Sequence, residues 1–137
     1  MLLGGMAVPY KVEWLVEKRV LLSRYEGMIS LEDARGQVSE GNALLRQGIP
    51  LTHSIVDMSA VEKLPSLQLA SEFMSTDMSD VRDKLGWTIV ITNNKFLKFA
   101  SSLFVPIFKV RQRFFGSLDE ALAFLQEEDN TLPPLKK

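Results

Sequence analysis

The chain has 137 residues, 46% of them apolar, so it can bury one core but has no room for two domains of ordinary size. Sixteen basic and seventeen acidic side chains nearly cancel, which excludes a global field that would draw the protein to nucleic acid or membrane. The sequence contains no cysteine, which excludes disulfides, thiol catalysis and thiolate metal sites.

The two ends of the chain are expected to lie outside the packed domain. The apolar start lacks the basic region of a signal peptide, and glycines and Pro9 interrupt it well before the roughly 20 residues that a membrane helix needs. The last residues are rich in proline and too few to pack alone. We predict a flexible arm over 1–9, a domain over 10–129 and a disordered tail over 130–137.

The domain is predicted to begin with two strands and a helix. Residues 10–17 alternate apolar and polar side chains, and residues 20–27 follow too soon for a helix between them, so a β-hairpin is expected. Apolar residues recur at helical spacing over 30–48. Gly36 and Gly41 cost that helix about 1 kcal/mol each, so we expect packing to stabilise it.

Single helices then alternate with single strands. We predict a strand over 51–58, a helix from near Ser66 through Phe73, a strand over 87–92, a helix over 95–105, a strand over 109–115 and a helix over 117–128. Ser117 and Glu120 form a capping box at the start of the last helix. The order ββαβαβαβα implies right-handed parallel crossovers, and hence a single α/β domain with a mixed, mostly parallel sheet and helices packed on it.

Three stretches of this chain resemble a known family. They are VEWLVEKRVLLSRYEGMISLEDA near the start, IVDMS in the middle and WTIVITNNKFLKFASSLFVPIFKVRQRFFGSLDEALAFL toward the end, and they span nearly all of Val12 to Leu125. With the order of elements, they resemble the STAS-type fold of bacterial anti-sigma factor antagonists and, more closely, the SpoIIAA-like family, whose fold is related to CRAL-TRIO lipid carriers. The resemblance implies a small non-enzymatic module that holds an apolar ligand or touches a membrane.

Ser66 has two interpretations. The antagonists carry an aspartate-serine-serine-glycine turn whose second serine receives phosphate at a helix start. This pattern puts Ser66 at the first serine and Leu67 at the acceptor, so phosphorylation of Ser66 needs a slip of one residue. The helix dipole would stabilise a phosphate there. We favour Ser66 as a helix N-cap, whose hydroxyl accepts a backbone hydrogen bond worth about 1 kcal/mol.

A ligand site is expected at the carboxyl ends of the parallel strands, where loops and helix N-termini converge. Three such ends are predicted, at 57–59, 92–94 and 116–117. Their polar residues would form a rim, but all are also good caps and turn formers, and we favour that role. Asp57 is a candidate ligand-binding residue because Ser59 can supply the cap in its place.

Catalysis has little support in the sequence. His53 is the only histidine, and in a strand it would lie about 13 Å from Asp57, too far for a direct dyad. A partner from elsewhere in the chain stays open, but a lone histidine at a strand start is usually a surface or edge residue. No metal-ligand spacing, phosphate loop or nucleophile elbow occurs. We predict a protein that is not an enzyme, with no catalytic residue, cofactor or metal.

The segment from Lys84 to Leu118 is basic and rich in phenylalanine, with six basic residues, no acidic residue and six of the eight phenylalanines. One interpretation is a helix packed on the sheet with its lysines in solvent. The other is an apolar pocket or membrane surface, with the lysines at anionic head groups. The candidates are Phe96, Phe99, Leu103, Phe104, Ile107 and Phe108 for ligand binding, and Lys95 and Lys98 for facing a membrane.

Two classes of function remain. The first is a cytoplasmic binding module that holds a lipid-like ligand or rests on the inner face of the membrane through the segment near 95–105. The second is a protein–protein regulatory module of the anti-sigma factor antagonist type, switched at Ser66. A protein partner or a homodimer fits both. Nucleic acid is not expected: Arg111 and Arg113 form a basic face with Phe115, but the acidic QEED follows closely.

Overall fold

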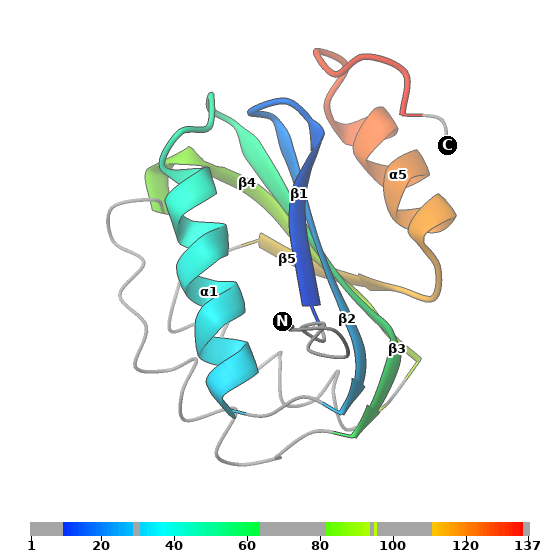
Figure 1. The fold of residues 1–137 in the computed structure, drawn as a ribbon. Coiled ribbons are helices and arrows are strands. Elements are labelled where there is room, and N and C mark those ends of the chain that lie inside the picture. Colours follow the sequence, from blue (N-terminus) through cyan, green and yellow to red (C-terminus); the bar gives the residue numbers. More distant parts are fainter. Residues whose placement is uncertain (1–9, 29–30, 64–81, 94, 96–110, 136–137) are drawn as a thin grey trace.

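A computed structural model describes residues 10–28, 31–63, 82–93, 95 and 111–135. The predicted arm, the predicted helix that starts near Ser66 and nearly all of the predicted helix over 95–105 lie outside these residues. The described part is an α/β fold with one five-stranded sheet and helices on both of its faces (Figure 1).

The sheet begins with a hairpin. β1 (Tyr10–Val16) pairs antiparallel with β2 (Val20–Met28). Lys18 lies in the turn with a φ of 61°, in the left-handed region, and the Arg19 amide donates to the Val16 carbonyl at 2.9 Å. The predicted β-hairpin is confirmed.

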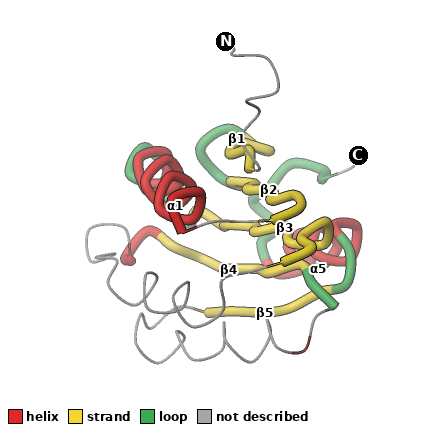
Figure 2. The backbone as a smooth tube through the Cα atoms, turned by 60° about the horizontal axis from the view of Figure 1, so that its bottom comes forward, coloured by secondary structure: helices red, strands yellow, loops and turns green. Residues whose placement is uncertain are grey.

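The remaining strands are parallel to β2 and to one another. They are β3 (Thr52–Lys63), β4 (Leu85–Ile91), which follows the short 3-10 helix η1 (Arg82–Lys84), and β5 (Arg111–Phe115). Figure 2 shows the strands side by side in chain order, β1-β2-β3-β4-β5. The mixed, mostly parallel sheet predicted from the sequence is confirmed.

Helix α5 (Leu118–Glu128) covers one face of the sheet. The Ser117 hydroxyl accepts from the Glu120 amide at 3.2 Å, and the Glu120 carboxylate accepts from the Gly116 amide at 3.0 Å, so the predicted cap is present. The apolar stripe of the helix packs on alternate residues of the central strands. Together with Leu132 from the C-terminal segment they form the larger core: Val20, Leu22, Ile55, Ile89, Ile91, Ala121, Leu122, Leu125 and Leu132.

Helix α1 (Leu31–Leu45) covers the other face beside β1 and β2. Gln37 is buried there; its carbonyl oxygen accepts from the Tyr25 hydroxyl at 2.6 Å, and its amide donates to Ser23 Oγ at 3.0 Å. A methyl group at Gly36 would lie 2.5 Å from the Tyr10 hydroxyl oxygen. The glycine therefore lowers the helix propensity but permits close contact with β1, in keeping with a helix stabilised by packing.

The predicted end of the third strand, at residue 58, is wrong: β3 continues to Lys63. Asp57 and Ser59 indicated a turn, but the Asp57 carboxylate accepts from the amide of Ser59 at 3.0 Å inside the strand. The register shows one extra residue in β3 there, because Arg24 pairs with Asp57 while Glu26 pairs with Ala60. Turn-forming side chains have made a β-bulge, which bends a strand without ending it.

The C-terminal segment also differs from the prediction. Residues 130–135, expected to be part of a disordered tail, are described beside α5. Leu132 is only 6% exposed within the larger core, and Leu135 packs against that core. The Gln126 side chain donates to the Leu132 carbonyl at 3.4 Å and accepts from the Leu135 amide at 2.6 Å. Leu132, Leu135 and Gln126 thus anchor a proline-rich segment that its composition predicts to be disordered.

Candidate functional site

The residues predicted to end three strands lie side by side, although β3 itself continues beyond them. Asp57 pairs with Ile91, and Ile91 pairs with Phe115, so these residues form one row across β3, β4 and β5. The Thr92 amide donates to the Phe115 carbonyl at 2.9 Å just beyond that row. We call this region the carboxyl edge and define it by Asp57, Ser59, Thr92, Asn93, Gly116 and Ser117.

Asp57 is held by its neighbours at this edge. Its Oδ1 accepts from the amide and the hydroxyl of Ser59, at 3.0 and 2.6 Å. Its Oδ2 lies 3.6 Å from Nε of Arg24 on β2, and its side chain is 13% exposed against 48% for Arg24. Asp57 therefore stabilises the bulge of β3 and stands in an ion pair that is open to solvent on the arginine side.

The other half of the carboxyl edge is the start of α5. Glu120 and Ser117 accept the hydrogen bonds that cap the helix, as described above. A methyl group at Gly116 would lie 3.0 Å from Asn93 Oδ1, so the β4 end and the β5 end are in close contact. Asn93 and Ser117 are exposed, and they form a small polar rim at the ends of β4 and β5.

The position of His53 was predicted wrongly from the sequence. It was expected at the surface or an edge, but it is 1% exposed. Its Nε2 donates to Asp129 Oδ2 at 2.9 Å, and its Nδ1 accepts from the Trp87 amide at 3.0 Å. Arg19 donates to the same carboxylate oxygen at 2.7 Å, and the Thr131 amide donates to Oδ1 at 3.0 Å.

We call His53, Asp129, Arg19 and Thr131 the buried network. Burial lowers the pKa of His53 below its ordinary 6.5, although the Asp129 carboxylate opposes that shift. Burial alone would raise the pKa of Asp129, but hydrogen bonds from Thr131 and His53 and the charge of Arg19 hold it well below its usual range. His53 is therefore neutral at pH 7, and its lack of exposure makes its role structural.

The carboxylate partner of His53 lies 76 residues further along the chain. The predicted absence of a His53–Asp57 dyad agrees with the structure, since His53 points to Asp129 and Asp57 to Arg24 and Ser59. The only hint of the His53–Asp129 contact in the sequence is that an acidic residue, Asp129, directly follows the last predicted helix. Nothing local in the sequence signals that contact.

Most of the ligand-site candidates lie outside the described residues: Ser66, Phe96, Lys98, Phe99, Leu103, Phe104, Ile107 and Phe108. Their roles stay predictions. Lys95 is described and exposed. Within the described ranges, no helix is long and apolar enough to cross a membrane, and no group of three His, Asp or Glu side chains could hold a metal ion.

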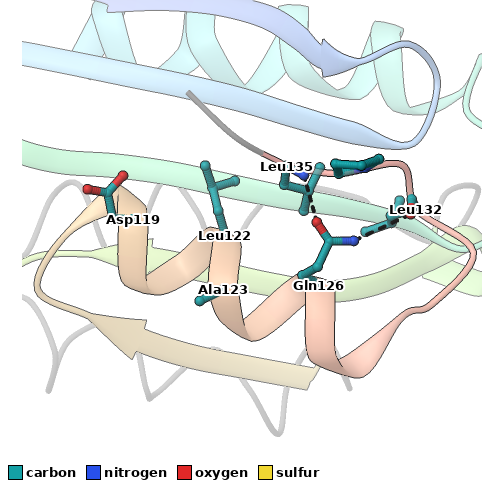
Figure 3. Close-up of a pocket in the computed structure, with 7 residues that line it drawn as sticks. Asp119, Leu122, Ala123, Gln126, Leu132 and Leu135 are labelled. Atoms are coloured by element: carbon teal, nitrogen blue, oxygen red, sulfur yellow. Dashed lines mark hydrogen bonds between the residues drawn. The ribbon is translucent and has the colours of Figure 1, made fainter.

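A cavity of about 840 Å³ that the sequence does not predict lies between α5 and the C-terminal segment (Figure 3). It is open to solvent and mainly apolar, and Gln126 stands at its wall with both of its hydrogen bonds made to the segment. Its lining residues are Asp119, Leu122, Ala123, Gln126, Leu132, Pro134 and Leu135.

Comparison with solved structures identifies the fold. An uncharacterised protein of the DUF3478 family with a SpoIIAA-like fold, from Shewanella loihica PV-4, superposes with a TM-score of 0.61 at 16% identity, over 85% of this chain and 91% of that one. The chain therefore has the SpoIIAA-like, STAS-type fold that the sequence resemblance implied.

A second similar structure carries a functional name. It is an anti-sigma factor antagonist from Mycobacterium paratuberculosis, with a TM-score of 0.53 at 18% identity, over 85% of this chain and 92% of that one. No family model and no curated protein matches the chain.

Proposed function

We propose that this protein is a non-enzymatic regulatory module that acts by binding another protein, in the manner of an anti-sigma factor antagonist. The observation that carries the proposal is the similarity to such an antagonist, which extends over 85% of this chain and 92% of the other. We take an anti-sigma factor as the partner class and the cytoplasm as the place of action.

The chemistry of the carboxyl edge supports binding over catalysis. A general base needs a polar atom free to take a proton from a substrate. Both oxygens of Asp57 are already used by Ser59 and Arg24, and the Glu120 carboxylate accepts from the Gly116 amide. A surface whose carboxylates are engaged in local hydrogen bonds and an ion pair is suited to binding a partner by shape and not to proton transfer.

Binding to the anti-sigma factors of the same organism tests the proposal. The purified full chain is titrated with each of them by isothermal calorimetry, and we expect one to bind with a dissociation constant of about 10 μM or tighter, which is roughly −7 kcal/mol. Asn93→Arg, at the exposed rim, should weaken that complex. Gln47 is exposed just after the C-terminal end of α1, away from the carboxyl edge, so Gln47→Arg is the matched control and should leave the affinity unchanged.

Deletion of the gene in its host provides the functional readout. Transcription from the promoters of the cognate sigma factor should fall, because its anti-sigma factor is no longer antagonised. If none of the anti-sigma factors binds and transcription does not change, the proposal is wrong. Intact mass from the host, compared with Ser66→Ala, shows whether phosphorylation at Ser66 accompanies this role.

The lipid-like ligand suggested by the phenylalanine-rich segment remains a hypothesis based on the sequence pattern alone. Native mass spectrometry after mild purification, together with flotation on anionic liposomes, decides it. A ligand-free protein that does not float with the liposomes would leave the regulatory module as the only function to pursue.

A further inference from the structure

Two exposed arginines lie on aromatic rings on the α5 side of β5. Cζ of Arg111 is 5.3 Å from the centroid of the Trp87 ring, and Cζ of Arg113 is 4.8 Å from that of Phe124 and 5.8 Å from that of Phe115. The rings also contact one another, since Phe124 lies 4.9 Å from Trp87 and 5.2 Å from Phe115. We call these five residues the arginine surface.

The two guanidinium groups of this surface are held by aromatic rings and not by carboxylates. Neither Arg111 nor Arg113 forms an ion pair within the described part of the chain, whereas Arg19 and Arg24 both do. The sequence offers no acidic residue between Lys84 and Leu118. Stacking on the rings restricts the two guanidinium groups, so less side-chain entropy is lost when a carboxylate binds them.

We propose that the arginine surface binds an acidic segment of a partner protein in extended conformation. Arg111 and Arg113 are two residues apart on one strand face, so their Cα atoms are ~6.6 Å apart. Carboxylates at alternate positions of an extended peptide repeat at nearly the same distance. Each guanidinium can then bind one carboxylate with two parallel hydrogen bonds.

A peptide fits this surface better than a nucleic acid does. Non-specific nucleic-acid binding depends on many phosphate contacts, and only two guanidinium groups are present. The inference goes beyond the proposed function, because it holds whether or not the partner is an anti-sigma factor.

The test is a fluorescence anisotropy titration with a labelled peptide in which glutamate alternates with threonine and valine. We expect saturable binding to the intact chain that weakens in higher salt. Arg111→Gln combined with Arg113→Gln should weaken binding at least about tenfold, because two charge-assisted contacts are lost. Lys11→Gln with Lys18→Gln, exposed on the opposite edge of the sheet, removes the same charge and should change binding less than about twofold.

The outcomes separate this site from its alternatives. No binding of the peptide by the intact chain, or equal losses in the arginine and lysine variants, overturns the proposal. Equally tight binding of an oligothymidylate or of anionic vesicles, lost in the arginine variant, would show a general anion surface and also overturn it. If the glutamine variant fails to fold, Arg111→Lys with Arg113→Lys keeps the charge but loses the paired hydrogen bonds, and should still weaken peptide binding several-fold.

Discussion

Replacement of Asp129 by alanine tests the energetic role of the buried network most directly. Asp129 is the C-cap residue of α5, and its carboxylate accepts hydrogen bonds from Arg19, His53 and Thr131. Its side chain is 14% exposed, and those of Arg19 and His53 are 17% and 1% exposed. The variant would leave the buried Nε2–H of His53 without its acceptor, and the Arg19 guanidinium without its carboxylate partner, with only the Leu51 carbonyl and the Thr131 hydroxyl as acceptors.

The expected loss is about 3 kcal/mol. Breaking a buried ion pair by removing one partner costs roughly 3–5 kcal/mol, and the residual exposure of Arg19 places this case at the lower end. For a domain of this size, such a loss lowers the melting temperature by ~10 °C. Because Asp129 joins α5 and the C-terminal segment to the start of β2 and β3, the whole domain should unfold in one transition.

Urea unfolding followed by circular dichroism and by tryptophan fluorescence measures this loss. Glu128→Ala, an exposed neighbour in the same helix turn, is the control and should stay within about 0.5 kcal/mol of the parent protein. A double-mutant cycle with Arg19→Ala should give a coupling energy above ~1 kcal/mol. A loss below about 1 kcal/mol for Asp129→Ala would refute the assignment of the buried network as a stabilising centre.

Three further predictions concern protonation of the buried network, the contact of Gly36 with Tyr10 and the Ser117 cap. Stability should fall as the pH drops below 6.5, because the pKa of His53 is lowered in the folded protein and the unfolded chain therefore takes up a proton first. It should fall again below pH 3.8, because the pKa of Asp129 is also lowered in the folded protein. Urea titrations at a series of pH values measure both effects, and His53→Gln should flatten the first fall. Gly36→Ala should destabilise the protein despite a better helix propensity of about 1 kcal/mol, and the added Tyr10→Phe should recover part of the loss in melting temperature. Ser117→Ala should cost about 1 kcal/mol in the same assay, and no change would contradict its role as N-cap.

Local patterns in the sequence were sufficient to predict the sheet. A strand, two linking residues and a second strand allow only a hairpin, and the single helices predicted between the later strands require parallel neighbours. The start of α5 was predictable for the same reason, because Ser117 and Glu120 lie within one turn and cap the helix without help from distant residues. The rim at the carboxyl edge followed from the parallel connection of β3, β4 and β5.

Contacts between distant segments were beyond local patterns. Asp57 and Ser59 form a hydrogen-bonded turn in either case, and only the pairing of the following residues with β2 decides that the turn becomes a bulge within β3. His53 looked like an edge residue because its burial depends on a carboxylate that approaches from the far end of the chain. The segment 130–135 was misjudged because the hydrogen bonds of Gln126 compensate for its lack of regular structure.

The amino ends of the parallel strands contribute to stability, whereas the carboxyl edge is the proposed binding surface. At the amino end, a methyl group at Gly86 would lie 2.5 Å from the His53 ring, and His53 is buried with its hydrogen bond to Asp129. No room is left for a ligand beside His53, so a substitution at this end is expected to alter the free energy of unfolding. At the carboxyl edge, Asn93 is exposed beside a frame held by Asp57 and the Ser117 cap of α5, so replacement of Asn93 can alter partner binding with little effect on folding. Asn93→Arg and Asp129→Ala should therefore separate the two properties, the first affecting affinity and the second the free energy of unfolding.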